Sequence, residues 1–138
     1  MGWLKEFYLR LRYGYEKRPT RLKLHGLVTV APARYRNDEE KFVRAAIIDI
    51  SSSGTAVECF SEFKVGDDIV LQFTLPTHRV ALSGEIMRRK SVPPTWIYGV
   101  RFIVYEADKH ALKQVLAFAR EEMRKLKKAQ SRNPSTAS

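Results

Sequence analysis

The chain has one cysteine, Cys59, among its 138 residues, and this scarcity excludes an internal disulfide and any cysteine-based metal cluster. Cys59 lies in an alternating apolar run, which predicts a buried thiol. The three histidines are isolated, without the spacing of metal ligands. The sequence also lacks a nucleophile–base pair and a carboxylate pair of catalytic spacing. We therefore expect no enzymatic activity, no metal and no cofactor.

Long hydrophobic runs are absent as well. No stretch approaches the ~18 apolar residues of a transmembrane helix. The first residues interrupt their apolar side chains with charges, unlike a signal peptide, and Gly2 lacks the Ser or Thr of a myristoylation signal. We therefore expect a cytoplasmic protein.

Positive charge is abundant, with a formal net charge of +10. Basic residues concentrate in two segments, residues 5–23 and residues 120–132. Such a balance favours an anionic partner. The charge is compatible with nucleic acid, a membrane surface, a phosphorylated small molecule or an acidic protein. It does not discriminate among these partners.

The N-terminal segment, residues 1–14, is predicted to be a short amphipathic helix because its apolar residues recur at helical spacing. These residues are Trp3, Leu4, Phe7, Tyr8 and Leu11. The apolar side suits packing against the domain or a partner, and its aromatic and basic residues also suit a membrane surface. Residues 15–21 follow as a basic loop, in which Pro19 disfavours a helix.

The central part of the chain alternates apolar and polar residues in short runs separated by turns, which indicates an antiparallel barrel or sandwich. Six strands are predicted, at residues 22–31, 42–50, 55–60, 69–75, 79–87 and 96–105. From Ala111 to Leu126 the apolar period becomes helical, which predicts an amphipathic helix that packs on the barrel. The domain is thus expected over residues 15–128, followed by a disordered tail, residues 129–138.

A polar turn between the second and third strands carries chemistry that suits a binding site. It reads Asp49-Ile50-Ser51-Ser52-Ser53-Gly54. Asp49 provides a carboxylate acceptor, and Ser51 can donate or accept beside it. Gly54 permits a positive φ or close backbone approach. Taken alone, such a turn also serves to hold its own backbone.

The order of these features resembles the PilZ domain, the receptor family for the bacterial second messenger cyclic di-GMP. The resemblance covers roughly residues 16–123 and includes Tyr98-Gly99-Val100-Arg101-Phe102, which lies on the last predicted strand. The motif Asp49-x-Ser51-x-x-Gly54 matches the family's Asp/Asn-x-Ser-x-x-Gly motif in full. The resemblance implies a six-stranded antiparallel β-barrel of mainly β class, with a C-terminal helix.

The family's other ligand motif, Arg-x-x-x-Arg before the first strand, is altered. Lys17 stands four residues before Arg21, and Arg18 stands three before it. Either Lys17 fills the first position, or Arg18 does so with a shorter loop. Arginine offers a planar fork to guanine O6 and N7, whereas lysine offers a point charge suited to a phosphate. The resemblance implies that Lys17, Arg18 and Arg21 take the phosphates and one guanine edge.

By the same resemblance, Asp49, Ser51 and Gly54 take the other base, and ligand binding orders the loop at residues 15–21. This ordering would move the N-terminal helix and expose or hide a surface for a bacterial protein partner in motility or biofilm regulation. Peripheral membrane contact through the basic segments stays open, as does the choice between monomer and homodimer.

Two alternatives stand beside this interpretation. Some PilZ-type proteins lack a complete arginine motif and act as adaptors in pilus or motility machinery without binding the nucleotide, and Lys17 favours this alternative. A small barrel that binds nucleic acid is the other. Such barrels display aromatic side chains among basic residues, whereas Phe60, Phe73 and Phe102 are predicted to face the core, so no nucleic-acid partner is expected.

Overall fold

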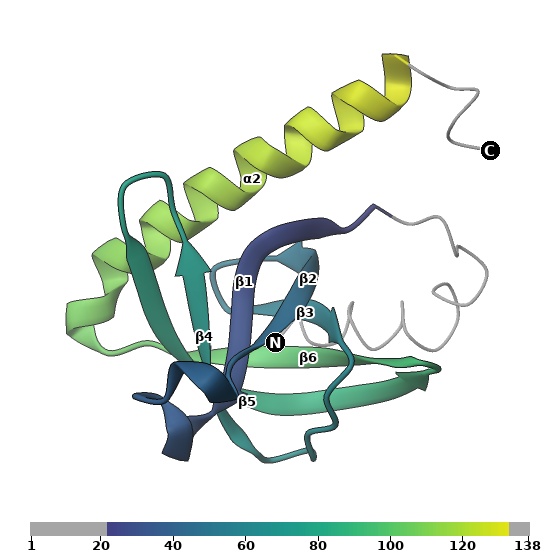
Figure 1. The fold of residues 1–138 in the computed structure, drawn as a ribbon. Helices are drawn as coiled ribbons and strands as arrows, with labels where there is room; N and C mark the ends of the chain where they lie inside the picture. The colour runs from purple at the N-terminus through teal and green to yellow at the C-terminus, as the bar shows by residue number, and fades with distance from the viewer. Residues whose placement is uncertain (1–21, 133–138) are drawn as a thin grey trace.

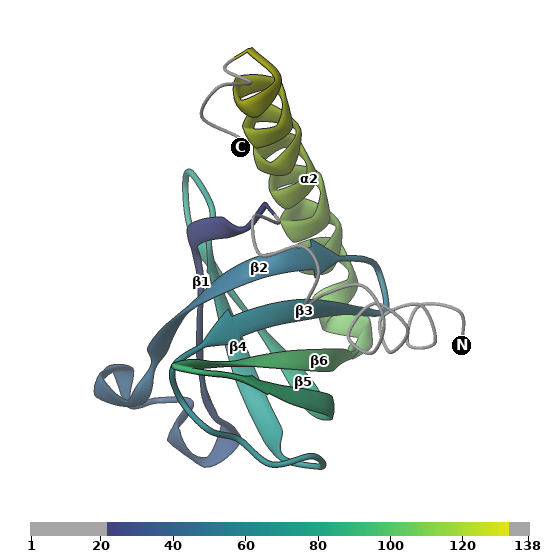
Figure 2. The ribbon, with the colours of Figure 1, turned by 90° about the vertical axis from the view of Figure 1, so that its right-hand side faces the viewer.

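The computed structural model describes residues 22–132, which form a closed six-stranded barrel with a long helix across it (Figures 1 and 2). The strands are β1 (Leu24–Pro32), β2 (Val43–Ile50), β3 (Gly54–Cys59), β4 (Asp68–Thr74), β5 (Arg79–Val92) and β6 (Thr95–Ile103). Short 3-10 helices are η3 (Ala33–Tyr35), η4 (Glu39–Lys41) and η5 (Glu106–Asp108), and the helix is α2 (Lys109–Arg132). The predicted N-terminal helix, residues 1–14, lies outside the described residues.

The barrel closes in the order β1-β2-β3-β6-β5-β4, and every neighbouring pair is antiparallel. This confirms the predicted fold. Closure pairs every strand on both sides and removes the exposed edges that an open sheet would have. The register shifts in β1, in β2 between Ile47 and Asp49, and in β5 between Ile86 and Arg88. Such bulges bend a strand and re-aim the side chains beside them.

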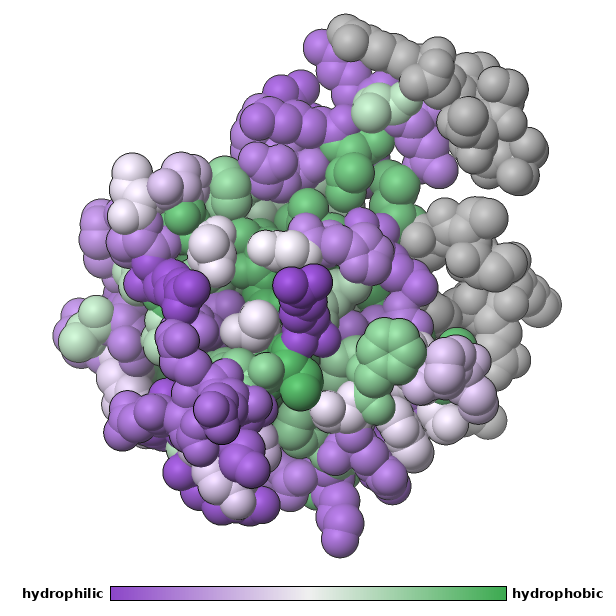
Figure 3. Space-filling view, in the orientation of Figure 1, coloured by the Kyte–Doolittle hydropathy of each residue, from purple (hydrophilic) through white to green (hydrophobic). Residues whose placement is uncertain are grey.

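Alternation along the strands explains the core. Inward positions carry large apolar side chains that are almost fully buried, such as Ile47, Leu71, Phe73 and Tyr98. Helix α2 adds Leu112, Val115, Leu116 and Ala119 to the same cluster. This helix is amphipathic, and its outward face is hydrophilic in Figure 3. Packing of its apolar stripe against the barrel matches the predicted role of this segment.

Three details differ from the sequence prediction. Strand β5 continues past residue 87 to Val92, because residues 88–92 pair with the first half of β6. Helix α2 continues to Arg132 and so includes residues 129–132, which were assigned to the tail. Phe60 was predicted to face the core, but its side chain is 74% exposed, because Val57 and Cys59 point inward and the alternation therefore turns Phe60 outward.

A buried polar contact in the barrel involves the hydroxyl of Tyr98. It donates to the carbonyl of Ser61 at 2.6 Å and accepts from the backbone N–H of Phe63 at 2.7 Å. Burial raises the pKa of Tyr98 to about 12, so this hydroxyl stays protonated at neutral pH. The two bonds tie the segment after β3 to β6.

The Tyr98→Phe variant is expected to lose about 2–3 kcal/mol of unfolding free energy, because both backbone groups lose a buried partner. Urea unfolding followed by circular dichroism measures this change. Tyr105→Phe is the matched control, since the Tyr105 side chain is 63% exposed. Equal losses in the two variants would contradict the structural role of the Tyr98 hydroxyl.

Among the described residues, no helix is long and apolar enough to cross a membrane.

Candidate functional site

The turn between β2 and β3 is held mainly by its own hydrogen bonds. The backbone N–H of Ser51 donates to the carbonyl of Gly54 at 2.8 Å. The Ser51 hydroxyl oxygen lies 3.3 Å from the backbone nitrogen of Ser53, which donates to it, and 3.2 Å from the Ser53 hydroxyl. The N–H of Phe102 donates to the Ser53 carbonyl at 2.9 Å. These contacts fix the shape of the turn and anchor it to the end of β6.

Asp49 sits at the bulge just before this turn. The bulge follows from the pairing, in which Ile47 faces Val57 and Asp49 faces Ala56. The Asp49 backbone carbonyl accepts from the hydroxyl of the buried Thr55 at 2.7 Å, and its Oδ1 accepts from the N–H of Ile50 at 2.9 Å. The backbone of Asp49 is therefore fixed by a buried contact.

A cavity of about 480 Å³ opens beside Asp49, between the end of β2 and helix α2. Its lining combines apolar and cationic side chains: Leu22, Ile48, Ile50, Met123, Arg120, Arg124 and Lys127, together with Asp49. Hydrophobic surface is visible in the seam between α2 and the barrel in Figure 3. A volume of this size is within the range of small-molecule sites.

The cavity lining offers three kinds of contact. Apolar side chains provide hydrophobic surface, cations attract anionic groups, and a carboxylate accepts from N–H donors. Apolar contact comes from side chains such as Ile48 and Met123, the cations come from α2, and the acceptor is Asp49. Leu22, which also lines the cavity, directly follows Arg21 in the chain. The described part of the chain thus begins at this cavity.

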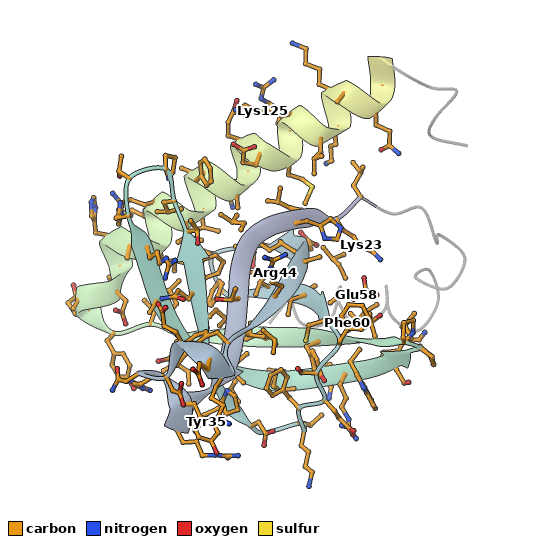
Figure 4. The ribbon with its side chains drawn as sticks, in the orientation of Figure 1. Lys23, Tyr35, Arg44, Glu58, Phe60 and Lys125 are labelled. Atoms are coloured by element: carbon orange, nitrogen blue, oxygen red, sulfur yellow. The ribbon has the colours of Figure 1, made fainter. Side chains whose placement is uncertain are left out.

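A second cavity of about 930 Å³ is lined by residues of β1 and β2, by Phe60 and by the turn between β5 and β6. Figure 4 shows Lys23, Arg44, Glu58 and Phe60 around this cavity. Lys23 forms an ion pair with Glu58 at 2.5 Å, so part of its charge is already balanced. This cavity does not include Asp49 in its lining. It is larger, and its lining includes the basic side chains Lys23, His25 and Arg44.

The candidate residues from the sequence divide into two groups. Lys17, Arg18 and Arg21 lie outside the described residues. Of the others, Asp49 lines the 480 Å³ cavity, whereas Ser51 and Gly54 lie in the adjoining turn. Gly54 does not take a positive φ; it is buried and pairs with Arg101 of β6. Of the two roles considered for Gly54, close backbone approach is the one compatible with this conformation.

Sequence reasoning missed the basic side chains of α2 that line the cavity. Arg120, Arg124 and Lys127 recur at i, i+4 and i+7, a spacing that puts them on one side of a helix. Met123, also in the lining, lies on the same side. The spacing was a detectable signal, but it did not reveal which strand end that side would face.

Other chemical centres are limited in the described part of the chain. Between residues 22 and 132, no three His, Cys, Asp or Glu side chains gather in a way that could hold a metal ion. Cys59 is buried, as predicted, and burial raises the pKa of its thiol to about 11. It is therefore protonated at neutral pH and poorly reactive.

Comparison with known proteins gives one family match, which covers residues 16–118 and is described as PilZ domain. Two solved structures share the fold. The PilZ domain of CeSA from a cellulose-synthesising bacterium is 18% identical, with a TM-score of 0.50 over 73% of this chain and 95% of that one.

The second structure is the inhibitor of motility MotI/DgrA from Bacillus subtilis. It is 19% identical, with a TM-score of 0.50 over 76% of this chain and 49% of that one. The chain thus spans about half the length of this structure. No match was found among curated proteins.

Proposed function

The chain belongs to the PilZ domain family, a family of non-catalytic cyclic di-GMP receptor domains, and on this premise we propose that it is a cytoplasmic effector that binds cyclic di-GMP. The observation that carries the proposal is the cavity beside Asp49. It combines a carboxylate acceptor, apolar surface and cations in about 480 Å³, next to the residue that follows Arg21.

In the proposed complex, Asp49 accepts the N1 and N2 hydrogens of one guanine. Ser51 and Gly54 hold the turn that presents this carboxylate, and Gly54 lets the ligand approach the backbone. Lys17, Arg18 and Arg21 contact the phosphates and the second base from the preceding loop. The apolar side chains Ile48 and Ile50 contact a base face.

The proposed output is a rearrangement of the N-terminal segment. Ile48, Ala56 and Ile97 form a second apolar cluster on the outer face of the barrel, apart from the main core. Ile48 also lines the cavity, so the ligand and this cluster share a side chain. We infer that ordering of residues 15–21 on ligand binding repositions the amphipathic segment, residues 3–11, relative to the barrel. A partner protein then reads the change.

Calorimetric titration of the full chain with cyclic di-GMP tests the proposal. We expect saturable binding, and we expect Lys17→Arg to tighten it about tenfold because a bidentate fork replaces a point charge. Arg21→Ala is expected to weaken binding at least about tenfold.

The absence of heat with wild-type chain at high micromolar ligand would overturn the binding proposal. It would favour the adaptor that acts through protein contacts alone, an alternative supported by Lys17 in place of the first motif arginine. An Arg21→Ala variant with unchanged affinity would show that the ligand binds away from the basic loop.

A further inference from the structure

One side of α2 presents a row of cations to the cavity beside Asp49. Arg120, Arg124 and Lys127 occupy successive turns, and all three line the cavity opposite the end of β2. Their side chains are exposed and long, so they can reach a ligand held between the helix and the strand. The family motifs that match this sequence do not include these residues.

The three cations differ in how their charge is balanced. Arg124 is engaged by Glu121 through two hydrogen bonds, at 2.6 and 3.1 Å. Within the described part of the chain, Arg120 and Lys127 form no ion pair. These two flank Arg124 along the helix, so the cavity wall keeps positive charge at two separated points. Two separated cations suit a ligand with two phosphates.

We propose that α2 is the phosphate-binding wall of the dinucleotide site, with Arg120 and Lys127 as the contacting residues. This inference rests on the proposed function and deepens it. Asp49 would hold a base edge on the strand side while the helix holds phosphate oxygens on the other. Arg120 and Lys127 supply positive charge from outside the Arg-x-x-x-Arg motif. This charge would offset the weaker contact expected from Lys17 in place of arginine.

A ligand bound in this way connects α2 to the barrel. The last fully buried helix residue is Ala119, whereas Met123 and Leu126 are only partly buried against the core. Beyond them the helix extends past the barrel (Figure 1). A dinucleotide that contacts both β2 and residues 120–127 of α2 would hold these distal turns in place. Both α2 and the N-terminal segment would then differ between the free and the ligand-bound states.

The test is calorimetric titration of the full chain with cyclic di-GMP, comparing Arg120→Ala and Lys127→Ala with wild type. Each variant is expected to bind about fivefold to tenfold more weakly. Alanine is the best helix former, so α2 persists in both. Lys125→Ala is the matched control, because Lys125 lies on the side of α2 away from the barrel (Figure 4) and pairs with Glu122 at 3.5 Å.

The control should change affinity less than about twofold, the effect of a screened distant charge. Unchanged affinity in Arg120→Ala and Lys127→Ala would overturn the phosphate-binding wall and leave the proposed function intact. Equal losses in all three variants would also overturn it, because they would reveal a general charge effect.

A second probe separates this inference from the proposed function. If wild-type chain gives no heat with cyclic di-GMP, the proposed function fails, and inorganic pyrophosphate then tests the wall by amide chemical shifts. Shifts centred on residues 120–127 that disappear in the Arg120→Ala/Lys127→Ala double variant would support an anion site on α2. Shifts that are absent, or that persist in the double variant, would overturn the wall as well.

Discussion

The Asp49→Ala variant is expected to bind cyclic di-GMP at least about a hundredfold more weakly than the wild-type chain, as measured by calorimetric titration. Within the cavity lining, Asp49 is the one acidic side chain. Its loss would leave the N1 and N2 hydrogens of a desolvated guanine without an acceptor, and buried donors without partners reduce affinity by large factors.

The fold should tolerate this substitution. The buried hydroxyl of Thr55 donates to the Asp49 backbone carbonyl, which alanine retains. The thermal midpoint is therefore expected to stay within a few degrees of the wild type, and a lower affinity then reports on the site alone. Asp49→Asn provides a graded comparison, because it keeps one oxygen acceptor and because the family motif admits Asn at this position.

Ser52→Ala serves as the control within the same turn, since Ser52 is exposed and outside the cavity lining. It should bind as the wild type does. Equal affinity in Asp49→Ala and Ser52→Ala would contradict the role of the carboxylate and move the search for the base contact to another residue.

The fold could be predicted because the sequence shows clear periodicities of apolar residues, one typical of strands and one typical of a helix. Strand β4 alternates without interruption through Ile69, Leu71 and Phe73, and all three are fully buried. The second half of β5 could not be predicted in this way, because Arg88-Arg89-Lys90-Ser91 has no apolar alternation. These residues are a strand because they pair with residues 96–99 of β6, a non-local contact that local patterns do not reveal.

The candidate site was only partly predictable, for a similar reason. Asp49 could be found from its motif, and the bulge that aims it depends on pairing between β2 and β3. The cavity needs a third partner, since Arg120 and Lys127 are about seventy residues further along the chain. The sequence shows that these cations share a side of a helix, but the facing strand end follows only from the packing of Val115 and Ala119 into the barrel.

Substitution of Gly84 is expected to have the largest effect on stability among the changes considered. Gly84 faces the barrel interior in β5, between the buried side chains of Leu82 and Ile86. A Cβ atom at this position would lie 2.6 Å from Cγ1 of Val100 and 2.9 Å from Cδ1 of Leu71. Both distances are far below van der Waals contact, and both neighbours are fully buried.

Gly84→Ala should therefore lower the unfolding free energy by about 2 kcal/mol, since Leu71 can move its terminal methyl but the branched Val100 cannot easily turn. Gly84→Val adds two further methyl groups in the same space and should cost more than about 4 kcal/mol. Urea unfolding measures both values. The comparison of the two variants is informative, because only a steric cause predicts that the loss of unfolding free energy grows with side-chain size.

Ser83→Ala is the matched control for these variants, because the neighbouring side chain points to the opposite side of the strand. It should change stability by less than about 0.5 kcal/mol. Equal stability of Gly84→Ala and wild type would mean that the barrel relaxes at this point.

A Gly84→Val chain that is still folded should bind cyclic di-GMP with wild-type affinity, since Gly84 packs against β4 and β6, whereas the cavity lies between β2 and α2. A stability loss without a loss of affinity would therefore separate the role of the barrel interior from that of the proposed site.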